Sequence, residues 1–425
     1  MPKIAMIGAG SMVFARWLMT DILSWPEMQE SEICLMDINA ERLELIGALV
    51  RKMVADRKLG ASVLATTDRQ RALDGADYVI ATISVGWTYE PERPEFAIPL
   101  AYGLNQSVAD TIGVGGIFRF LRTAPTMLDI CRDVERLCPR ALLLNYVNPM
   151  AMLCWSIARA TKVWTVGLCH SVQGTAHQLA GYVGVPEDEV SYWTAGINHQ
   201  AWYLVLRRGK EDLYPRLRER MEDPEIYAQD RVRFEILRHF GYFVTESSRH
   251  MSEYVPYFRR TPELLEQFAP PPNPAAATRR AQRFESIRQQ VDGAEPIDYT
   301  RSGEYCSYII HALETNQPFR FNANVSNDDL ITNLPRGCCV EVPCLADGAG
   351  IHPCHVGDLP PQLAALNRTN VNVQELAVKA FLERDREAVH QAVQVDPLAS
   401  SVLSLAQMRK MTDELFAANA DWIGF

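Results

Sequence analysis

Short apolar runs alternate with amphipathic segments over the first 170 residues of the chain. Residues 1–22 predict a strand, a glycine turn and a helix, and five more helix or strand signals follow before residue 140. The further strands expected from apolar runs are Glu32–Met36, Ala61–Thr66, Asp77–Ile83, Ala141–Tyr146 and Val163–Leu168. The helices expected between them include Ala40–Asp56, with apolar residues at helical spacing, and a long one at about Ile117–Leu137. This alternation predicts an α/β fold built on a parallel, doubly wound sheet with right-handed crossovers.

The regular alternation of strand and helix signals ends after about residue 170. Trp202–Arg207 and Cys338–Pro343 are strand-like, Phe268–Ala277 predicts a surface loop, and the tail from about Pro360 is helical. We therefore expect a Rossmann-like domain at 1–168. Residues 169–425 are then expected to form an α+β lobe for substrate, metal and oligomerisation.

The first turn has the character of a dinucleotide-binding turn. Its two glycines end an apolar run, and Asp37 ends the next one, where a carboxylate can accept hydrogen bonds from ribose hydroxyls. The third small position is occupied by Val13, so an ordinary strand–turn–helix remains an alternative. The expected cofactor contacts share the carboxyl edge of the sheet and are Gly8, Gly10, Ser11, Met12, Asp37 and Ser84.

Two further segments are expected to reach the same edge. Asp110–Gly116 is a second glycine-rich loop before a long helix, which fits close approach to a ligand or, alternatively, a flexible connector. Asn148 precedes Pro149, and this order predicts an N-cap for the next helix.

The amino-acid composition limits which partners and which cellular location we expect. The 425 residues are 48% hydrophobic and 22% charged, with a formal net charge of −10 and no long basic run, which disfavours nucleic acid as a partner. No stretch predicts a signal peptide or a membrane span, and the ten cysteines lack the rhythm of a disulfide scaffold. We expect a protein with reduced thiols in the cytoplasm and no membrane partner.

Cys169 and His199 are the sharpest candidate metal ligands. Cys169 closes an expected strand, and His199 lies in the Gly196-Ile197-Asn198-His199 stretch. A thiolate and an imidazole suit a divalent transition metal and leave positions open for substrate oxygens. Each residue alone could equally be structural.

Tyr254 and Tyr257 are candidate phenolic bases. They lie three residues apart around Pro256, and a nearby cation or metal-bound substrate would lower their pKa. Two packing tyrosines are the alternative.

Taken together, these motifs resemble glycoside hydrolase family 4, and most closely its bacterial melibiase-type α-galactosidases. The matching stretches occur in order along nearly the whole chain: Gly8–Ser11, Asp110–Gly116, Asn145–Pro149, Cys169–Gly174, Gly196–His199, Glu246–Ser248 with Ser252–Tyr254, and Leu334–Val342. The resemblance implies bound NAD and a divalent metal, with Mn2+ expected. It implies hydride removal from C3 of the sugar, proton removal from C2 and elimination of the C1–O bond.

The resemblance also implies residue roles. Cys169 and His199 match the metal ligands and Tyr254 matches the base, with Tyr257 held in reserve. Asn148 matches a residue at the sugar C2 and C3 hydroxyls, and we count it among the cofactor contacts as well. Asp110 matches an acidic residue beside the sugar, as an acid or a hydroxyl clamp.

His170 departs from the pattern of the 6-phosphoglycosidases, which carry Asp there as the acid. We expect His170 to contact an unphosphorylated sugar and to protonate the leaving oxygen. The expected activity is that of an α-galactosidase working as a homodimer or homotetramer. An α-galacturonidase or α-glucosidase of the same family, and a lactate/malate-type NAD-dependent dehydrogenase, remain alternatives.

Overall fold

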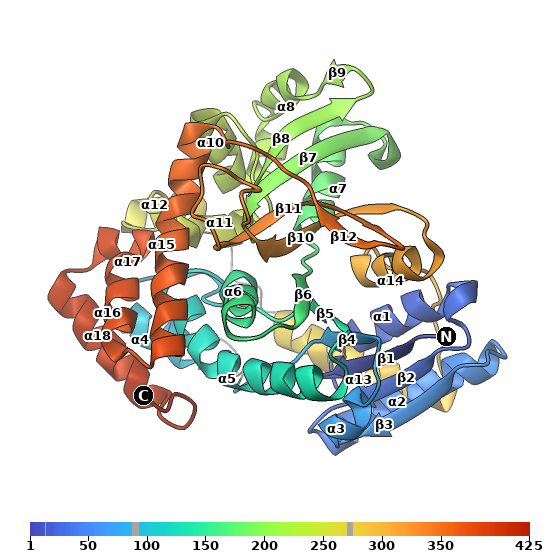
Figure 1. The fold of residues 1–425 in the computed structure, drawn as a ribbon. Helices are drawn as coiled ribbons and strands as arrows, with labels where there is room; N and C mark the ends of the chain where they lie inside the picture. The colour runs from blue at the N-terminus through green and yellow to red at the C-terminus, as the bar shows by residue number, and fades with distance from the viewer. Residues whose placement is uncertain (13, 87–92, 270–274) are drawn as a thin grey trace.

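The computed structural model of the chain describes residues 1–12, 14–86, 93–269 and 275–425 (Figure 1). Val13, at the third small position of the glycine turn, lies outside the described residues. Residues 270–274 of the loop predicted at Phe268–Ala277 lie outside them too. The last part of that predicted loop is wrong, because a helix begins at Ala275.

The strands in the described part of the chain form one twelve-stranded sheet in the order β3-β2-β1-β4-β5-β6-β10-β11-β7-β8-β9, with β12 paired to β11. Their bounds are β1 (Lys3–Ile7), β2 (Glu32–Met36), β3 (Ser62–Thr66), β4 (Tyr78–Ala81), β5 (Leu142–Asn145), β6 (Trp164–Gly167), β7 (Val190–Ile197), β8 (Gln200–Arg208), β9 (Glu211–Asp212), β10 (Phe319–Ser326), β11 (Cys339–Asp347) and β12 (Gly350–Pro353).

Helices cover both faces of this sheet and extend the molecule beyond it (Figure 1). The first group is α1 (Phe14–Leu23), α2 (Ala40–Asp56), α3 (Arg69–Leu73), α4 (Pro94–Ala101), α5 (Gly113–Leu137), α6 (Met150–Ala160), α7 (Ser171–Val183), α8 (Tyr214–Arg220) and α9 (Pro224–Gln229). The second is α10 (Arg231–Phe240), α11 (Ser248–Tyr254), α12 (Pro262–Phe268), α13 (Ala275–Asp292), α14 (Tyr305–Thr315), α15 (Pro361–Glu383), α16 (Arg386–Gln394), α17 (Pro397–Val402) and α18 (Leu405–Ala418).

The first six strands confirm the predicted doubly wound sheet. All their pairings are parallel, and the order 3-2-1-4-5-6 is the one typical of dinucleotide-binding folds. Residues 4–7 of β1 are fully buried or nearly so, as expected for a strand covered on both faces. The carboxyl ends of these strands therefore form one edge on which ligand-binding residues can gather.

The long helix α5 begins four residues earlier than predicted. Because glycines are weak helix formers, the sequence pattern predicts that this helix starts only at Ile117, after the glycines. In the structure a Cβ at Gly115 would lie 2.5 Å from the carbonyl oxygen of Ala109, and one at Gly116 would lie 2.7 Å from the carbonyl carbon of Thr111. The first turn of α5 is thus glycine-rich because the preceding loop packs directly on it.

The predicted N-cap of α6 is wrong by one residue. Pro149 occupies the cap position, and the Asn148–Pro149 peptide bond is cis. The Asn148 side chain still accepts a hydrogen bond from the Met150 backbone N–H at 3.3 Å. This contact fixes the side chain close to the carboxyl end of β5.

The second half of the chain extends the same sheet with antiparallel strands. β10 joins β6 through a single pair, Asn324 with Gly167, and β11 joins β7 through Glu341 and Gly196. The α+β character predicted for this half is therefore present, but its strands continue the first sheet. The division at 168/169 remains a proposal.

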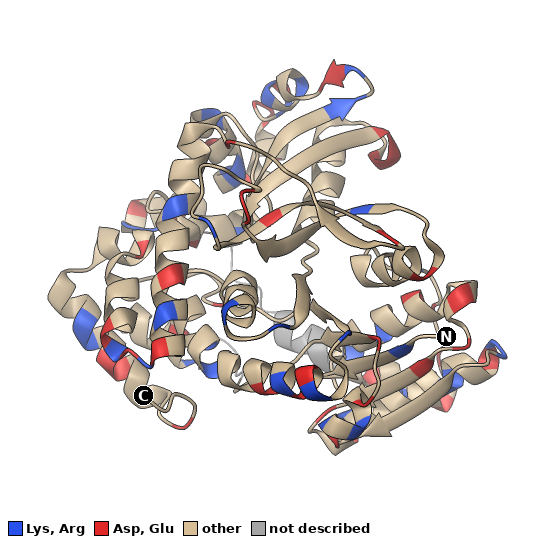
Figure 2. Cartoon of the chain, viewed as in Figure 1, with Lys and Arg blue, Asp and Glu red and all other residues tan. Residues whose placement is uncertain are grey.

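Packing between helices holds the two halves together. α1 packs on α2 and α14, while α5 and α6 pack on each other and on α15. Figure 2 shows Lys, Arg, Asp and Glu interspersed along α5 and the C-terminal helices on the face drawn.

Among the described helices, none is long and apolar enough to cross a membrane.

Candidate active site

The glycine turn after β1 is shaped for close approach by a ligand. Gly8 has φ +92°, and a Cβ there would lie 2.7 Å from the backbone nitrogen of Ile83. The Asp37 carboxylate accepts hydrogen bonds from the backbone N–H groups of Gly10 and Asn39, both at 2.8 Å. Asp37 thereby braces the turn from the end of β2, where the second strand of a dinucleotide site presents its acidic residue.

The other predicted cofactor contacts lie around this turn. The backbone N–H of Ser11 donates to the Gly8 carbonyl at 3.1 Å, and Thr82 Oγ1 donates to the same oxygen at 2.9 Å. Ser11 and Met12 are half-buried, and Ser84 is exposed. A turn without room for a Cβ, flanked by polar groups at the carboxyl edge, fits a bound NAD.

Three side chains from distant segments meet at the same edge. Cys169 follows β6, His199 lies in the two-residue turn between β7 and β8, and Glu246 precedes α11. One ligand atom from each lies within 4.8 Å of the other two, and His199 Nε2 is 3.5 Å from Glu246 Oε2. Sulfur, nitrogen and oxygen donors at this spacing fit a divalent transition metal.

The backbone is strained at two of these three positions. His199 has φ +63° and Glu246 has φ +75°, in the left-handed region that residues with a Cβ seldom adopt. Such conformations concentrate at functional sites, because the surrounding structure has to hold them. The tight turn is what aims the imidazole of His199 at Cys169.

The charges around Cys169, His199 and Glu246 favour the binding of a cation. Burial raises the pKa of Cys169 above its ordinary range, and Glu341 and Glu246 raise it further. Burial also acts to raise the pKa of Glu246, but His199 and His250 outweigh it and hold that pKa well below its usual value. A divalent ion among these donors would stabilise the Cys169 thiolate and the Glu246 carboxylate together.

Tyr254 adjoins the cluster, and Tyr257 does not. The fully buried Tyr254 hydroxyl lies 3.1 Å from His199 Nδ1. Tyr257 is 41% exposed and packs against Phe240 with ring centroids 5.9 Å apart. Burial, reinforced by neighbouring carboxylates, holds the pKa of Tyr254 well above its ordinary value, so its ionisation also calls for a cation nearby.

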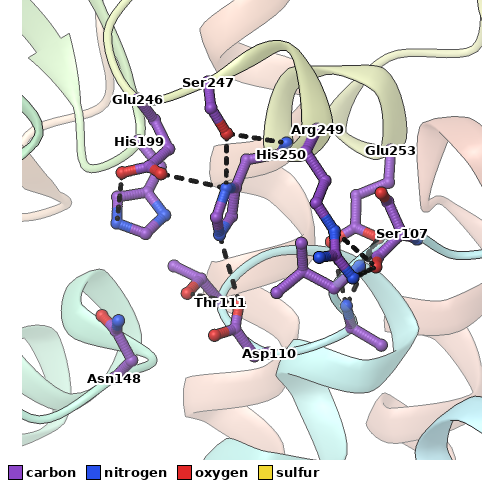
Figure 3. Close-up of polar contacts among 12 residues, drawn as sticks. Ser107, Asp110, Thr111, Asn148, His199, Glu246, Ser247, Arg249, His250 and Glu253 are labelled. Carbon is purple, nitrogen blue, oxygen red and sulfur yellow. Dashed lines mark hydrogen bonds and ion pairs between the residues drawn. The ribbon is translucent and has the colours of Figure 1, made fainter. Parts of the chain in front are cut away.

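Asp110 is an ionised acceptor in this arrangement. His250 Nε2 lies 3.9 Å from Asp110 Oδ1, and His250 Nδ1 lies 3.0 Å from Glu246 Oε1, so His250 bridges the two carboxylates (Figure 3). Burial acts to raise the pKa of Asp110, but Arg119, His250 and His199 hold it below its ordinary value. Of the two roles implied for Asp110, the geometry favours the hydroxyl clamp over the acid.

A buried carboxylate on α11 fixes the loop that carries Asp110. Glu253 accepts hydrogen bonds from three consecutive backbone N–H groups: that of Ser107, that of Val108 at 2.9 Å and that of Ala109 at 3.0 Å (Figure 3). Arg249, one turn earlier, donates to the Ser107 carbonyl at 2.8 Å. The helix that bears Tyr254 is thereby tied to the loop that bears Asp110.

His170 and Asn148 lie at the borders of the cluster. The His170 side chain is 63% exposed, and its Nδ1 lies 3.6 Å from Glu304 Oε1. In Figure 3 Asn148 lies across from His199 and Asp110, with no dashed line to either. His170 is near enough to Glu246 to help lower the pKa of that carboxyl.

Sequence reasoning missed Glu246 and His250. Glu246 lies in a matched stretch and His250 between two of them, and neither has a predicted role, because a carboxylate and an imidazole on a short polar segment carry no periodic signal. Their convergence on His199 depends on the hairpin turn and on the start of α11. The left-handed Glu246 is not marked by a glycine or an asparagine that could have indicated the turn.

We expect Glu246→Gln to weaken Mn2+ binding by at least tenfold, because a neutral amide replaces one of three donors. Isothermal titration of metal-stripped protein measures this, and Cys169→Ser should show the same direction. Glu187→Gln is the matched control, since Glu187 forms an exposed pair with His177 at 2.7 Å. Unchanged affinity in Glu246→Gln would remove it from the ligand set.

We expect Glu253→Gln to lower kcat by about tenfold or more while leaving Mn2+ affinity unchanged. The amide cannot accept from all three N–H groups, and a buried donor without a partner costs about 1–3 kcal/mol. Steady-state kinetics and metal titration on the same sample give both readouts, with the exposed Glu266→Gln as control. Parallel loss of metal binding and kcat would mean general disruption of the site.

Comparison with known proteins gives one consistent result. A model described as "Family 4 glycosyl hydrolase" matches residues 3–185, and one described as "Family 4 glycosyl hydrolase C-terminal domain" matches residues 194–399. An α-galactosidase of Bacillus subtilis (strain 168) is 43% identical over 429 residues, covering 100% of this chain and 99% of the relative. An α-galactosidase of Rhizobium meliloti (strain 1021) is 37% identical, covering 99% and 89%.

A solved structure has the same fold. The 6-phospho-α-glucosidase from gut microorganisms, in complex with NAD and Mn2+, aligns with a TM-score of 0.83 at 20% identity, covering 99% of each chain. The fold agreement and the two family models confirm the resemblance drawn from the motifs. The chain belongs to family 4 of the glycosyl hydrolases and is a glycosidase of that family.

Proposed function

We propose that this glycosidase hydrolyses unphosphorylated α-galactosides with the help of NAD+ and a divalent metal, expected to be Mn2+. Full-length identity of 43% to an α-galactosidase supports the substrate. The observation that carries the proposal is the convergence of Cys169, His199 and Glu246 beside Tyr254, at the edge that holds the glycine turn. This edge of the sheet therefore combines a dinucleotide-binding turn, a metal site and a base.

The chain contributes the base and the positioning groups. When bound, NAD+ supplies a hydride acceptor for C3 of the sugar, and the metal supplies Lewis-acid polarisation of the C3 oxygen. Tyr254 then removes the proton from C2, which permits the C1–O bond to break by elimination. His199, 3.1 Å from the Tyr254 oxygen, links the base to the metal donors.

Two residues hold the sugar hydroxyls in this proposal. Asp110 accepts from a hydroxyl as an ionised clamp, held by Arg119 at 3.2 Å. Asn148 presents its amide near the C2 and C3 hydroxyls and the cofactor. Orientation of this kind places the C2 proton within reach of the base.

His170 is the proposed acid for the departing oxygen. It follows Cys169 directly, faces Glu304 and is exposed enough to exchange protons with water. Its presence where 6-phosphoglycosidases carry Asp supports an unphosphorylated substrate. α-Galacturonides and α-glucosides remain alternative substrates of the same reaction, whereas membership in a glycosidase family argues against a lactate/malate-type dehydrogenase. We further propose that the enzyme works in the cytoplasm as a homodimer or homotetramer, without nucleic-acid or membrane partners.

We expect p-nitrophenyl α-galactoside to be cleaved only when NAD+, Mn2+ and a thiol reductant are all present. Protein stripped by a chelator and gel filtration should be inactive and should recover on adding back both cofactors. No net NADH should accumulate, because the hydride is returned in each turnover. Sugar release that persists in the stripped protein would contradict the proposal.

We expect His170→Ala to slow cleavage of an alkyl α-galactoside about 100-fold or more, and that of the p-nitrophenyl galactoside much less. A poor leaving group needs a proton from an acid, and a good one does not. Rates on both substrates measure this, with His177→Ala on α7, the helix that His170 directly precedes, as control. Equal, small effects on both substrates would exclude His170 as the acid.

A further inference from the structure

Two fully buried asparagines on α15, Asn367 and Asn370, bind the hairpin that carries His199. Asn367 Nδ2 donates to the Gln200 backbone carbonyl at 2.7 Å and to Gln200 Oε1 at 3.1 Å. Asn370 Nδ2 donates to the same Oε1 at 3.0 Å. Because Gln200 directly follows His199, α15 holds the hairpin next to a candidate metal donor.

The orientation of these amides is fixed by a group that can only donate. The indole N–H of Trp202 donates to Asn367 Oδ1 at 3.0 Å. Nδ2 of Asn367 therefore faces Gln200, whose Oε1 is left to accept. Asn370 presents its Nδ2 to that oxygen in turn, so it acts as a donor toward the hairpin.

Asn370 also binds the end of the helix that carries Tyr254. The last carbonyls of a helix have no partner within it. α11 ends at Tyr254, whose carbonyl accepts from Asn370 Nδ2 at 3.0 Å. One buried amide thus joins the two elements whose side chains meet where the Tyr254 hydroxyl lies 3.1 Å from His199 Nδ1.

Both elements need such a hold. His199 has φ +63°, a conformation that persists only where the surroundings fix it. α11 has seven residues, too few for helix propensity alone to keep Tyr254 in place. Reacting side chains have to be held to within about 0.5 Å, and a buried amide with two donors provides that support.

We propose that Asn370 is a positioning residue for the base: it fixes Tyr254 relative to His199 and thereby sets the reach of the phenolic oxygen toward the C2 proton of the sugar. The inference rests on the proposed function. The turn expected to seat the cofactor is held by Asp37 instead. Loss of Asn370 therefore slows proton removal from C2 more than hydride removal from C3.

The test compares Asn370→Ala and Asn370→Leu with the wild type. Leucine fills the space of the amide without a donor, so a loss shared by both variants belongs to the hydrogen bonds and not to a cavity. With an aryl α-galactoside we expect kcat to fall about tenfold or more in each, with KM and Mn2+ affinity within about twofold of the wild type. Asn372→Ala, at an exposed position of the same helix, is the matched control and should behave as the wild type.

Deuterium at C2 and at C3 separates positioning from general damage. When proton removal becomes slower, oxidation at C3 has time to reverse, so the isotope effect on kcat/KM rises at C2 and falls at C3. A smaller fraction of folded enzyme lowers kcat but leaves both isotope effects as they are in the wild type. Unchanged isotope effects in the two Asn370 variants, or a loss of Mn2+ affinity in parallel with kcat, would overturn the inference.

Amide hydrogen exchange tests the anchor without turnover. Exchange within Ser248–Tyr254 should be faster in both Asn370 variants and unchanged in Asn372→Ala. If the wild type cleaves no α-galactoside, the proposed function fails, and faster exchange in this helix still supports the hold of Asn370 on it. If the wild type shows the isotope effects but exchange in both Asn370 variants equals that of the wild type, the inference fails alone.

Discussion

A surplus of buried and half-buried acidic groups at the carboxyl edge of the sheet governs this molecule. Glu246, Glu341, Glu253 and Asp110 gather there with a thiol and a phenol, while His199, His250 and Arg119 oppose them. Burial raises the pKa of Glu341 to about 7, which shows how costly a further negative charge is at this edge. A divalent cation among the three candidate donors would balance this charge and stabilise both the Cys169 thiolate and an ionised Tyr254.

Common elements of secondary structure place the three candidate metal donors. Cys169 comes with the last parallel strand, His199 with a two-residue hairpin turn, and Glu246 with the entry to α11. The Glu253 clamp then fixes the Asp110 loop against that same helix. The glycine turn follows β1 at the same edge, so one sheet carries both the expected cofactor contacts and the candidate metal donors.

Periodicity predicted the first half of the fold well, since buried parallel strands and amphipathic helices leave strong local signals. It could not reveal that the second half continues the same sheet, because only Asn324 and Gly167 join the two at β6. Cys169, His199 and Tyr254 came from motif resemblance, and the structure brings them together. Their roles remain predictions. Glu246 and His250 could not be assigned, because their function depends on contacts between distant segments.

Elimination after oxidation at C3 would break the glycosidic bond without direct displacement at C1. The most direct measurement compares kcat/KM for aryl α-galactosides carrying deuterium at C2, at C3 or at neither. We expect a primary isotope effect at one or both positions, since a C–H bond breaks at each during oxidation and elimination. Cleavage equally fast for all three substrates would contradict it and point instead to direct displacement at C1.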